Sequence, residues 1–209
     1  MPLTDEDLNQ IATRTLAHYD QRAQAYWEGT RDHDVSQNID AFLGAITVAP
    51  PFDLLDVGCG PGRDLARFCA LGHHAVGVEG SLQLAAMARA HSGCQVLVQN
   101  LLQLDLPARR FDGVFANAVL FHLPSQALPR LLAQLHASLK PGGVFFSSNP
   151  RGAGQAGWSG DRYGVFYDWP AWRALVLAAG FVELQHFYRP SGLPLAQQPW
   201  LASVWRKPL

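Results

Sequence analysis

The sequence contains no apolar run that approaches the roughly 20 residues needed to span a bilayer. Its polar, acidic beginning, MPLTDEDLNQ, does not resemble a signal peptide either. These absences argue against a membrane-embedded or exported protein. We therefore expect a cytoplasmic location and no membrane partner.

Cysteine is scarce as well. The chain has three cysteines, Cys59, Cys69 and Cys94, an odd number with no paired spacing. This usage suits a reducing compartment and argues against a disulfide scaffold. A zinc site built from cysteines alone is equally unsupported, and we expect no metal site.

No charge of either sign is in large excess. The 16 basic and 17 acidic residues leave a formal net charge of −1. A nucleic-acid partner is therefore not expected, because such partners attract a basic surface. With 209 residues, of which 48% are hydrophobic and 16% charged, the chain fits a single folded domain. We expect residues 1–50 to form a helical lid and residues 51–209 an α/β core.

Hydrophobic periodicity predicts helices in the N-terminal segment. Apolar and aromatic side chains recur every three or four positions across residues 5–27, which predicts one helix. A polar stretch, 28–38, precedes a short predicted helix at 39–46. The pair Pro50-Pro51 ends this segment because adjacent prolines disfavour helix.

Beyond Pro51 the pattern alternates between strands and helices. Strands are predicted at 53–57, 75–79, 95–98, 113–117, 144–148, 182–188 and 201–206. Helices are predicted at 63–71, 81–90, 126–139 and 169–179. Strands that alternate with helices indicate a doubly wound, mostly parallel α/β sheet. No helix separates the last two strands, so they are expected to pair antiparallel at one edge.

A glycine loop follows the first predicted strand. Asp56-Val57 leads into Gly58-x-Gly60-x-Gly62 and then into a helix. Glycines allow tight turns with positive φ and a close approach of the backbone to a ligand. About twenty residues on, Glu79 stands at the tip of the next strand, where a carboxylate can accept both hydroxyls of a ribose.

Two other interpretations of this loop remain open. A plain tight turn between strand and helix would also use glycines. A nicotinamide-dinucleotide site has the different pattern Gly-x-Gly-x-x-Gly, and Asp64 stands near the place of its third glycine. We therefore rank a nicotinamide-dinucleotide site second, below a site for a different cofactor that contains adenosine.

Four motifs resemble the class I S-adenosylmethionine-dependent methyltransferases. They are LLDVGCGPGRD at 54–64, VGVEGS at 76–81, FDGVFANAVLFHL at 111–123 and LKPGGVFF at 139–146. The resemblance, in particular to small-molecule members from bacteria, implies a Rossmann-like sheet of seven strands whose last strand is antiparallel. It also implies S-adenosyl-L-methionine as the cofactor and S-adenosyl-L-homocysteine as its product.

The resemblance further implies roles for individual residues. Asp56 and the loop would lie against the methionine moiety, Glu79 would hold the ribose and Leu82 would flank the adenine. Asn100 stands where the family commonly has an aspartate that bonds the adenine amino group, and Asn117 would lie beside the sulfonium. The implied cofactor-binding set is Tyr19, Tyr26, Asp56, Gly58, Cys59, Gly60, Gly62, Glu79, Gly80, Leu82, Asn100, Leu101 and Asn117.

The N-terminal segment supplies candidate residues for the acceptor side. Aromatic faces of Tyr19 and Tyr26 can attract a sulfonium by cation–π interaction, and Trp27 is a candidate substrate contact. Both tyrosines would equally serve to pack a helix on the sheet. His33, between two aspartates, and His122, after the fourth strand, are candidate catalytic bases. A solvated loop or a single ligand of a metal site for His33, and a packing role for His122, are the alternatives.

A second cluster follows the fifth predicted strand. Arg162 lies in the segment 149–168 with Tyr163 and Tyr167, and both Arg162 and the later Arg189 can bind a carboxylate in forked geometry. These four residues are candidate substrate contacts. Exposed arginines are often only hydrated surface residues, so a surface position without a binding role stays open for both.

The sequence thus favours a methyltransferase that acts in line on a small-molecule acceptor. The motif Asn/Asp-Pro-Pro-Tyr/Phe of nucleobase amino methyltransferases is absent, because that place reads Asn117-Ala118-Val119-Leu120. Two alternatives are a catalytically silent protein that binds S-adenosylmethionine or S-adenosylhomocysteine and, less favoured, a nicotinamide-dependent oxidoreductase. A monomer and a homodimer are both compatible with the sequence.

Overall fold

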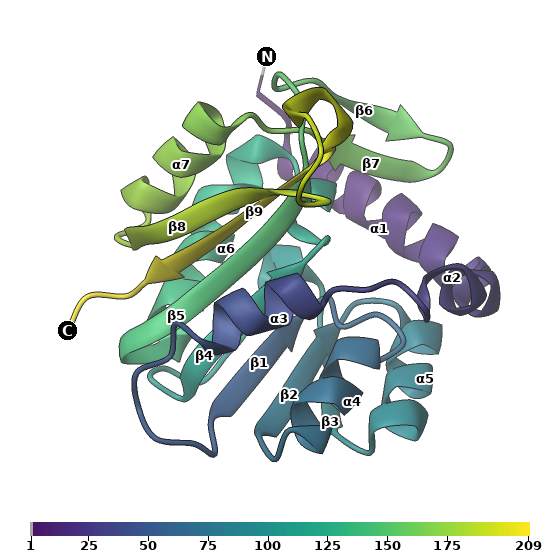
Figure 1. Cartoon of the computed structure of the whole chain (residues 1–209). Helices are drawn as coiled ribbons and strands as arrows, with labels where there is room; N and C mark the ends of the chain where they lie inside the picture. The colour runs from purple at the N-terminus through teal and green to yellow at the C-terminus, as the bar shows by residue number, and fades with distance from the viewer. Residues whose placement is uncertain (1) are drawn as a thin grey trace.

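The computed structural model describes residues 2–209 and has an α/β architecture (Figure 1). Its main sheet has the strand order β3-β2-β1-β4-β5-β9-β8. The strands are β1 Asp53–Val57, β2 His74–Glu79, β3 Gln95–Val98, β4 Phe111–Asn117, β5 Leu139–Pro150, β8 Val182–Arg189 and β9 Trp200–Arg206. β9 lies between β5 and β8 and is antiparallel to both, whereas the other neighbouring pairs are parallel. The predicted fold class and the antiparallel last strand are confirmed.

Helices cover both faces of this sheet. α3 (Ser36–Leu43), α4 (Arg63–Ala70) and α5 (Leu82–Ser92) lie on one face, and α6 (Leu128–Ser138) and α7 (Trp169–Ala178) lie on the other (Figure 1). Each face has its own apolar core. α6 shows why the helices pack as they do, since its leucines at spacings of three and four form a fully buried stripe.

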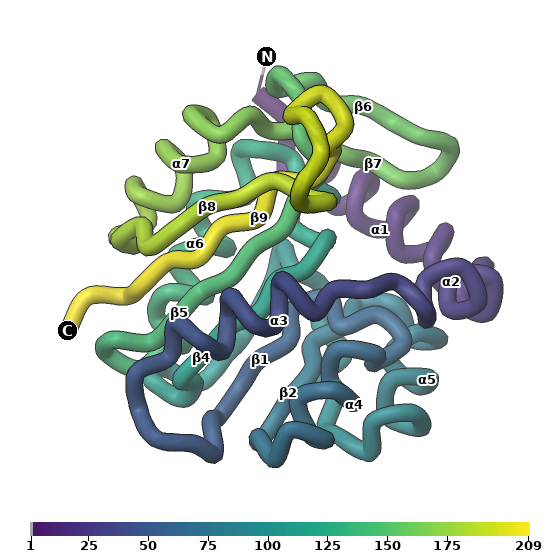
Figure 2. Tube along the Cα trace, in the orientation of Figure 1, coloured from purple at the N-terminus to yellow at the C-terminus, as the bar shows by residue number. Residues whose placement is uncertain are grey.

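The N-terminal segment differs from its prediction. The helix expected over 5–27 is two helices, α1 (Asp5–Gln21) and α2 (Ala23–Thr30), because Arg22 leaves helical geometry with φ −120° and ψ 18°. The short helix predicted at 39–46 is α3, which begins earlier, at Ser36. A break at Arg22 turns α2 away from the axis of α1 (Figure 2).

A small hairpin that the sequence did not predict packs against α1. It consists of β6 (Ala156–Ser159) and β7 (Arg162–Val165), paired antiparallel. α1 and β7 lie side by side (Figure 2). The Tyr163 backbone N–H donates to Thr15 Oγ1 at 3.2 Å, and Arg14 pairs with Asp161 at 2.9 Å. These contacts fix α1 across the carboxyl ends of the parallel strands.

No helix within residues 2–209 is both long and apolar enough to cross a membrane.

Candidate functional site

Two adjoining cavities lie at the carboxyl ends of β1, β2 and β4. The first has a volume of about 90 Å³ and the second about 700 Å³. This edge of a parallel sheet is where ligands bind in doubly wound folds. The cavities share one stretch of wall, formed by Tyr19, Tyr26, Gly58, Gly60 and Ala118.

The three glycines of the loop have different surroundings. Gly58 has φ +65°, and a Cβ there would lie 2.2 Å from Val119 Cγ2. Gly60 has φ +54° and donates its backbone N–H to Glu79 Oε2 at 2.9 Å. Gly62 lines neither cavity, and a Cβ there would lie 2.8 Å from Ala88 Cα of α5. The first two glycines therefore shape the site, while Gly62 allows close packing of α4 on α5.

Glu79 lies at the tip of β2 and lines the first cavity. Its Oε1 accepts the Ser81 backbone N–H at 2.8 Å, in addition to the Gly60 bond to Oε2. Burial raises the pKa of Glu79, and the backbone N–H groups around it, including that of Gly80, partly oppose this rise. Each carboxylate oxygen keeps lone-pair capacity for a further donor, such as a ribose hydroxyl.

The apolar part of the first cavity comes from α1 and from the segment after β3. Leu101 lines it, and so does Asn100, whose Oδ1 also caps the following turn by accepting the Leu102 N–H at 3.0 Å. Leu16 of α1 closes over Gly80, where an added Cβ would lie 2.6 Å from Leu16 Cδ2. The cavity is narrow because α1 packs this closely on the strand tips.

Leu82 is not part of this cavity. Its side chain is 64% exposed, although the sequence suggested that it flanks the adenine. α5 begins at Leu82 with Ser81 as its N-cap, and Asp20 of α1 accepts hydrogen bonds from Ser81 Oγ at 2.6 Å and from Gln83 N at 3.0 Å. These contacts set the rotation of the first turn and leave Leu82 toward solvent.

Asp56 is buried behind the loop and lines neither cavity. Burial, together with nearby Asp64, raises the pKa of Asp56 well above its ordinary value. Its Oδ2 has no hydrogen-bond partner among the described residues. The expected contact between Asp56 and a methionine moiety therefore requires a bridging water or a shift of the loop.

His122 and Tyr19 form a hydrogen-bonded pair at the first cavity. His122 Nδ1 lies 2.6 Å from the Tyr163 carbonyl oxygen and Nε2 lies 2.9 Å from the Tyr19 hydroxyl. A carbonyl accepts only, so Nδ1 carries the proton and Nε2 accepts from Tyr19. Burial lowers the pKa of His122 to about 4 and raises that of Tyr19. His122 is thus a neutral ring that orients the Tyr19 hydroxyl.

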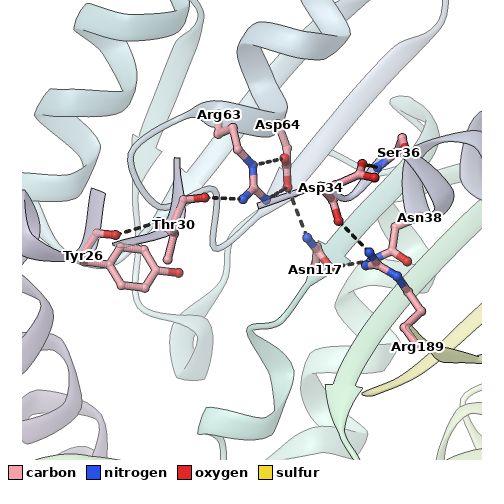
Figure 3. Close-up of polar contacts among 9 residues, drawn as sticks. All are labelled: Tyr26, Thr30, Asp34, Ser36, Asn38, Arg63, Asp64, Asn117 and Arg189. Atoms are coloured by element: carbon pink, nitrogen blue, oxygen red, sulfur yellow. Dashed lines mark hydrogen bonds and ion pairs between the residues drawn. The ribbon is translucent and has the colours of Figure 1, made fainter. Parts of the chain in front are cut away.

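The second cavity has a polar wall (Figure 3). Asn117, at the end of β4, donates to Asp64 Oδ2 at 3.3 Å and accepts from Asn38 Nδ2 at 3.0 Å. Asp64 in turn pairs with Arg63, with 2.8 Å between Nε and Oδ1, and Arg63 also donates to the Thr30 carbonyl at 2.9 Å. This network ties α2, α3, α4 and β4 together around Asn117.

The remaining predicted residues divide between the second cavity and other places. Cys59, His33, Arg162 and Arg189 line the second cavity. Arg189 donates to the Asp34 carbonyl at 2.6 Å, and Arg162 Nε is buried without a partner among residues 2–209.

Three predicted substrate residues line neither cavity. Trp27 packs on His91 with ring centroids 4.9 Å apart, and Tyr163 packs edge-on against Trp158. Tyr167 is a core residue, 3% exposed, whose hydroxyl lies 2.8 Å from Ser125 Oγ. We therefore leave Trp27, Tyr163 and Tyr167 out of the candidate site, because their side chains pack against other aromatic or core groups.

Sequence reasoning missed two groups of site residues. Arg63 and Asp64 follow the glycine loop directly, so their place at the second cavity was readable from the motif GPGRD. Asn38 gave no signal, because an amide in a polar stretch is recognised as a buried partner of Asn117 only after folding. Within the described residues, no group of three or more His, Cys, Asp or Glu side chains is placed to hold a metal ion.

Comparison with known proteins gives both a family and a fold. Residues 54–143 match the family model of a methyltransferase domain. Trans-aconitate 2-methyltransferase of Azoarcus sp. (strain BH72) is 39% identical over 105 residues, covering 47% of this chain and 39% of that protein. Ubiquinone biosynthesis O-methyltransferase of Alkalilimnicola ehrlichii is 28% identical over 170 residues, covering 72% of this chain and 66% of that protein. The chain thus spans less than two thirds of the length of these curated relatives.

Among solved structures, 1,6-didemethyltoxoflavin-N1-methyltransferase of Burkholderia thailandensis is similar over the whole chain. Its crystal structure has 1,6-didemethyltoxoflavin and S-adenosylhomocysteine bound. The TM-score is 0.77 at 25% sequence identity, covering 100% of this chain and 93% of the other.

Proposed function

This chain belongs to the class I S-adenosylmethionine-dependent methyltransferases, and from that membership we propose that it transfers a methyl group from S-adenosylmethionine to a small-molecule acceptor. The observation that carries the proposal is the pair of adjoining cavities at the carboxyl edge of the sheet. The largely apolar lining of the first cavity suits an adenosine, although at about 90 Å³ the cavity must widen to admit one. A larger, charged one beside it suits a methionine moiety and an acceptor.

The residues present fit the cofactor of this family. The left-handed backbone at Gly58 and Gly60 brings main-chain atoms to the cavity wall, where a side chain at position 58 would strike Val119. Glu79 would hold the ribose hydroxyls, and Leu101 and Asn100 would surround the adenine. Asn117 would lie at the methionine moiety, held in place by Asp64 and Asn38.

The cofactor supplies an electrophilic methyl group on a sulfonium. The protein's task is to align the acceptor with that methyl group and to exclude water. Tyr19 and Tyr26 form the wall between the cavities, and the ring centroids of these two residues lie 5.2 Å apart. Their rings would stabilise a sulfonium bound at this wall, and the hydrogen bond from the Tyr19 hydroxyl to His122 would keep Tyr19 oriented. We assign His122 a positioning role on this basis.

The second cavity favours an acceptor that carries a negative charge. Arg162 and Arg189 both line it, and neither has a salt bridge to a side-chain carboxylate among residues 2–209. Burial lowers the pKa of Arg189, so binding an anion there would relieve the cost of its desolvation. His33 stands at the same cavity and is the candidate base for an acceptor that arrives protonated. The Azoarcus and Burkholderia relatives are named for small-molecule acceptors, and the second cavity, at about 700 Å³, is large enough for a small molecule.

Calorimetry and a turnover screen together test the proposal. We expect S-adenosylhomocysteine to bind and NADH not to bind. A screen of metabolite pools for cofactor consumption should then yield a product heavier by one CH₂. Binding of NADH without S-adenosylhomocysteine would refute the cofactor. Tight S-adenosylhomocysteine binding without methyl loss across a broad panel of acceptors would instead favour a catalytically silent protein.

A further inference from the structure

Two cysteines that are distant in sequence meet at the edge of the sheet opposite the cavities. Cys69 lies in the last turn of α4, near the amino end of β2, and Cys94 directly precedes β3. Their sulfur atoms are 2.7 Å apart, although both are free thiols in this structure. Even carbon atoms, which are smaller, prefer about 3.5–4.0 Å when they are not bonded. The chain therefore holds the two sulfurs at a separation from which a bond can form.

The surroundings of this pair favour a defined geometry. Gly93, in a left-handed conformation at φ +70°, ends α5 and turns the chain into Cys94. The Cys94 backbone N–H donates to Ser92 Oγ at 3.1 Å, which fixes the turn. Both cysteines are partly buried and pack against the apolar core beneath α4 and α5. They stay partly open to solvent, so a small oxidant has access.

We propose that Cys69 and Cys94 form a reversible intramolecular disulfide that joins α4 to the start of β3. The third cysteine, Cys59, is left as a buried thiol at the second cavity. This accounts for the odd number of cysteines and revises the expectation that they do not pair. The proposal does not depend on the methyl-transfer activity, because the pair lies at the amino ends of the strands.

A low-molecular-weight disulfide such as oxidised glutathione supplies the oxidant. The Cys94 thiolate attacks one of its sulfurs, which gives a mixed disulfide and releases one glutathione thiol. The Cys69 thiolate then attacks the Cys94 sulfur and expels the second glutathione. Two thiol protons and two electrons leave the protein, and the oxidant becomes two thiols. Burial and the Cys94 sulfur raise the pKa of Cys69, and the same two steps with the cysteines exchanged give the same bond.

The bond would close a ring over residues 69–94, which contains β2, Glu79 and α5. Closing a ring of this size restricts the unfolded chain and raises Tm by about 5–10 °C for a protein of this length. Cofactor affinity should change less than about twofold, because the bond lies at the opposite edge of the sheet from Glu79.

Peptide mapping of the full chain gives a direct test. After oxidised glutathione and alkylation of free thiols, trypsin should yield residues 68–89 linked to residues 90–109, lighter than their sum by two hydrogens, with Cys59 alkylated. The oxidised protein should also have the higher Tm. Cys69→Ser and Cys94→Ser should each abolish the linked peptide and the Tm difference. Cys59→Ser, the matched control, should keep both.

Several results would overturn the proposal. One is three alkylated cysteines after oxidation of the wild-type chain. Others are glutathione that remains on Cys69 or Cys94 without closure, and a bond that involves Cys59. A Tm rise of equal size in Cys94→Ser would likewise show that the ring is not its cause. Mapping of the wild-type chain decides the matter even where a serine variant folds poorly.

Discussion

Substitution of Gly62 by alanine separates the packing role of the glycine loop from its binding role. Gly62 has φ +89°, and an added Cβ would lie 2.8 Å from Ala88 Cα and 3.0 Å from Ala88 Cβ. Gly72 has nearly the same conformation, φ +87°, but nothing lies within 4 Å of the place that a Cβ would occupy there. The two positions therefore share backbone strain and differ in steric contact.

The expected loss of stability follows from these two contributions. A left-handed conformation costs a residue with a Cβ about 1–2 kcal/mol. Overpacking adds about 1–3 kcal/mol where the neighbour cannot move, and here the neighbour includes the backbone of α5. We expect Gly72→Ala to lower the free energy of unfolding by about 1–2 kcal/mol and Gly62→Ala by about 2–5 kcal/mol. The lower entropy of unfolded alanine affects both variants alike and cancels in the comparison.

Urea unfolding followed by circular dichroism measures both variants, and calorimetry gives their affinity for S-adenosylhomocysteine. Gly62→Ala should bind with nearly wild-type affinity while it is folded, because Gly62 lines neither cavity. Equal losses of stability at the two positions would refute the packing argument. If Gly62→Ala kept wild-type stability but lost affinity for S-adenosylhomocysteine, Gly62 would instead belong to the cofactor-binding site.

Three further predictions follow from the site. Glu79→Ala should weaken S-adenosylhomocysteine binding by about 1–3 kcal/mol in calorimetry, the scale of lost charged hydrogen bonds. Leu82 is nearby and exposed, so the control variant Leu82→Ala should bind S-adenosylhomocysteine with wild-type affinity. An equal loss of affinity in both variants would contradict the proposed ribose site at Glu79. Arg162→Met should raise the KM of an anionic acceptor at least tenfold with unchanged cofactor affinity; an unaltered KM would contradict an arginine-bound anion. The folded pKa of His122, about 4, lies below its unfolded value of 6.5. Its neutral form therefore contributes stability above about pH 6.5 that is lost as the pH falls toward 4, by at most about 1.4 kcal/mol per pH unit. In His122→Gln, the free energy of unfolding in urea should depend less on pH between about 4 and 6.5. An unchanged dependence would contradict the lowered pKa of His122.

Much of the fold was predictable because its signals are local. Alternating strands and helices gave the order of elements, and the absence of a helix before β9 (Trp200–Arg206) indicated its antiparallel pairing. The hairpin of β6 and β7 was missed, since its glycine-rich segment lacks the alternation of apolar and polar residues that marks a strand. The break at Arg22 was missed for a similar reason, because the apolar spacing continues across it.

The site was predictable in part. Gly58, Gly60 and Glu79 were predicted together from their short, regular distances along the chain, and all three line the first cavity. Leu82 was assigned from the family resemblance and Tyr167 from the segment after the fifth strand, but the rotation of a helix and the packing of a core decided where their side chains lie.

By itself, the sequence determined the sheet, the glycine loop and the acidic residue at the next strand tip, because backbone conformation and hydrophobic period act over a few residues. Only the tertiary structure decided that α1 covers the strand tips, that Tyr19 and Tyr26 stand between two cavities, and that Cys69 lies against Cys94. Each of these depends on contacts between segments far apart in the chain. Their geometry follows from how whole helices pack on the sheet, which no local pattern encodes.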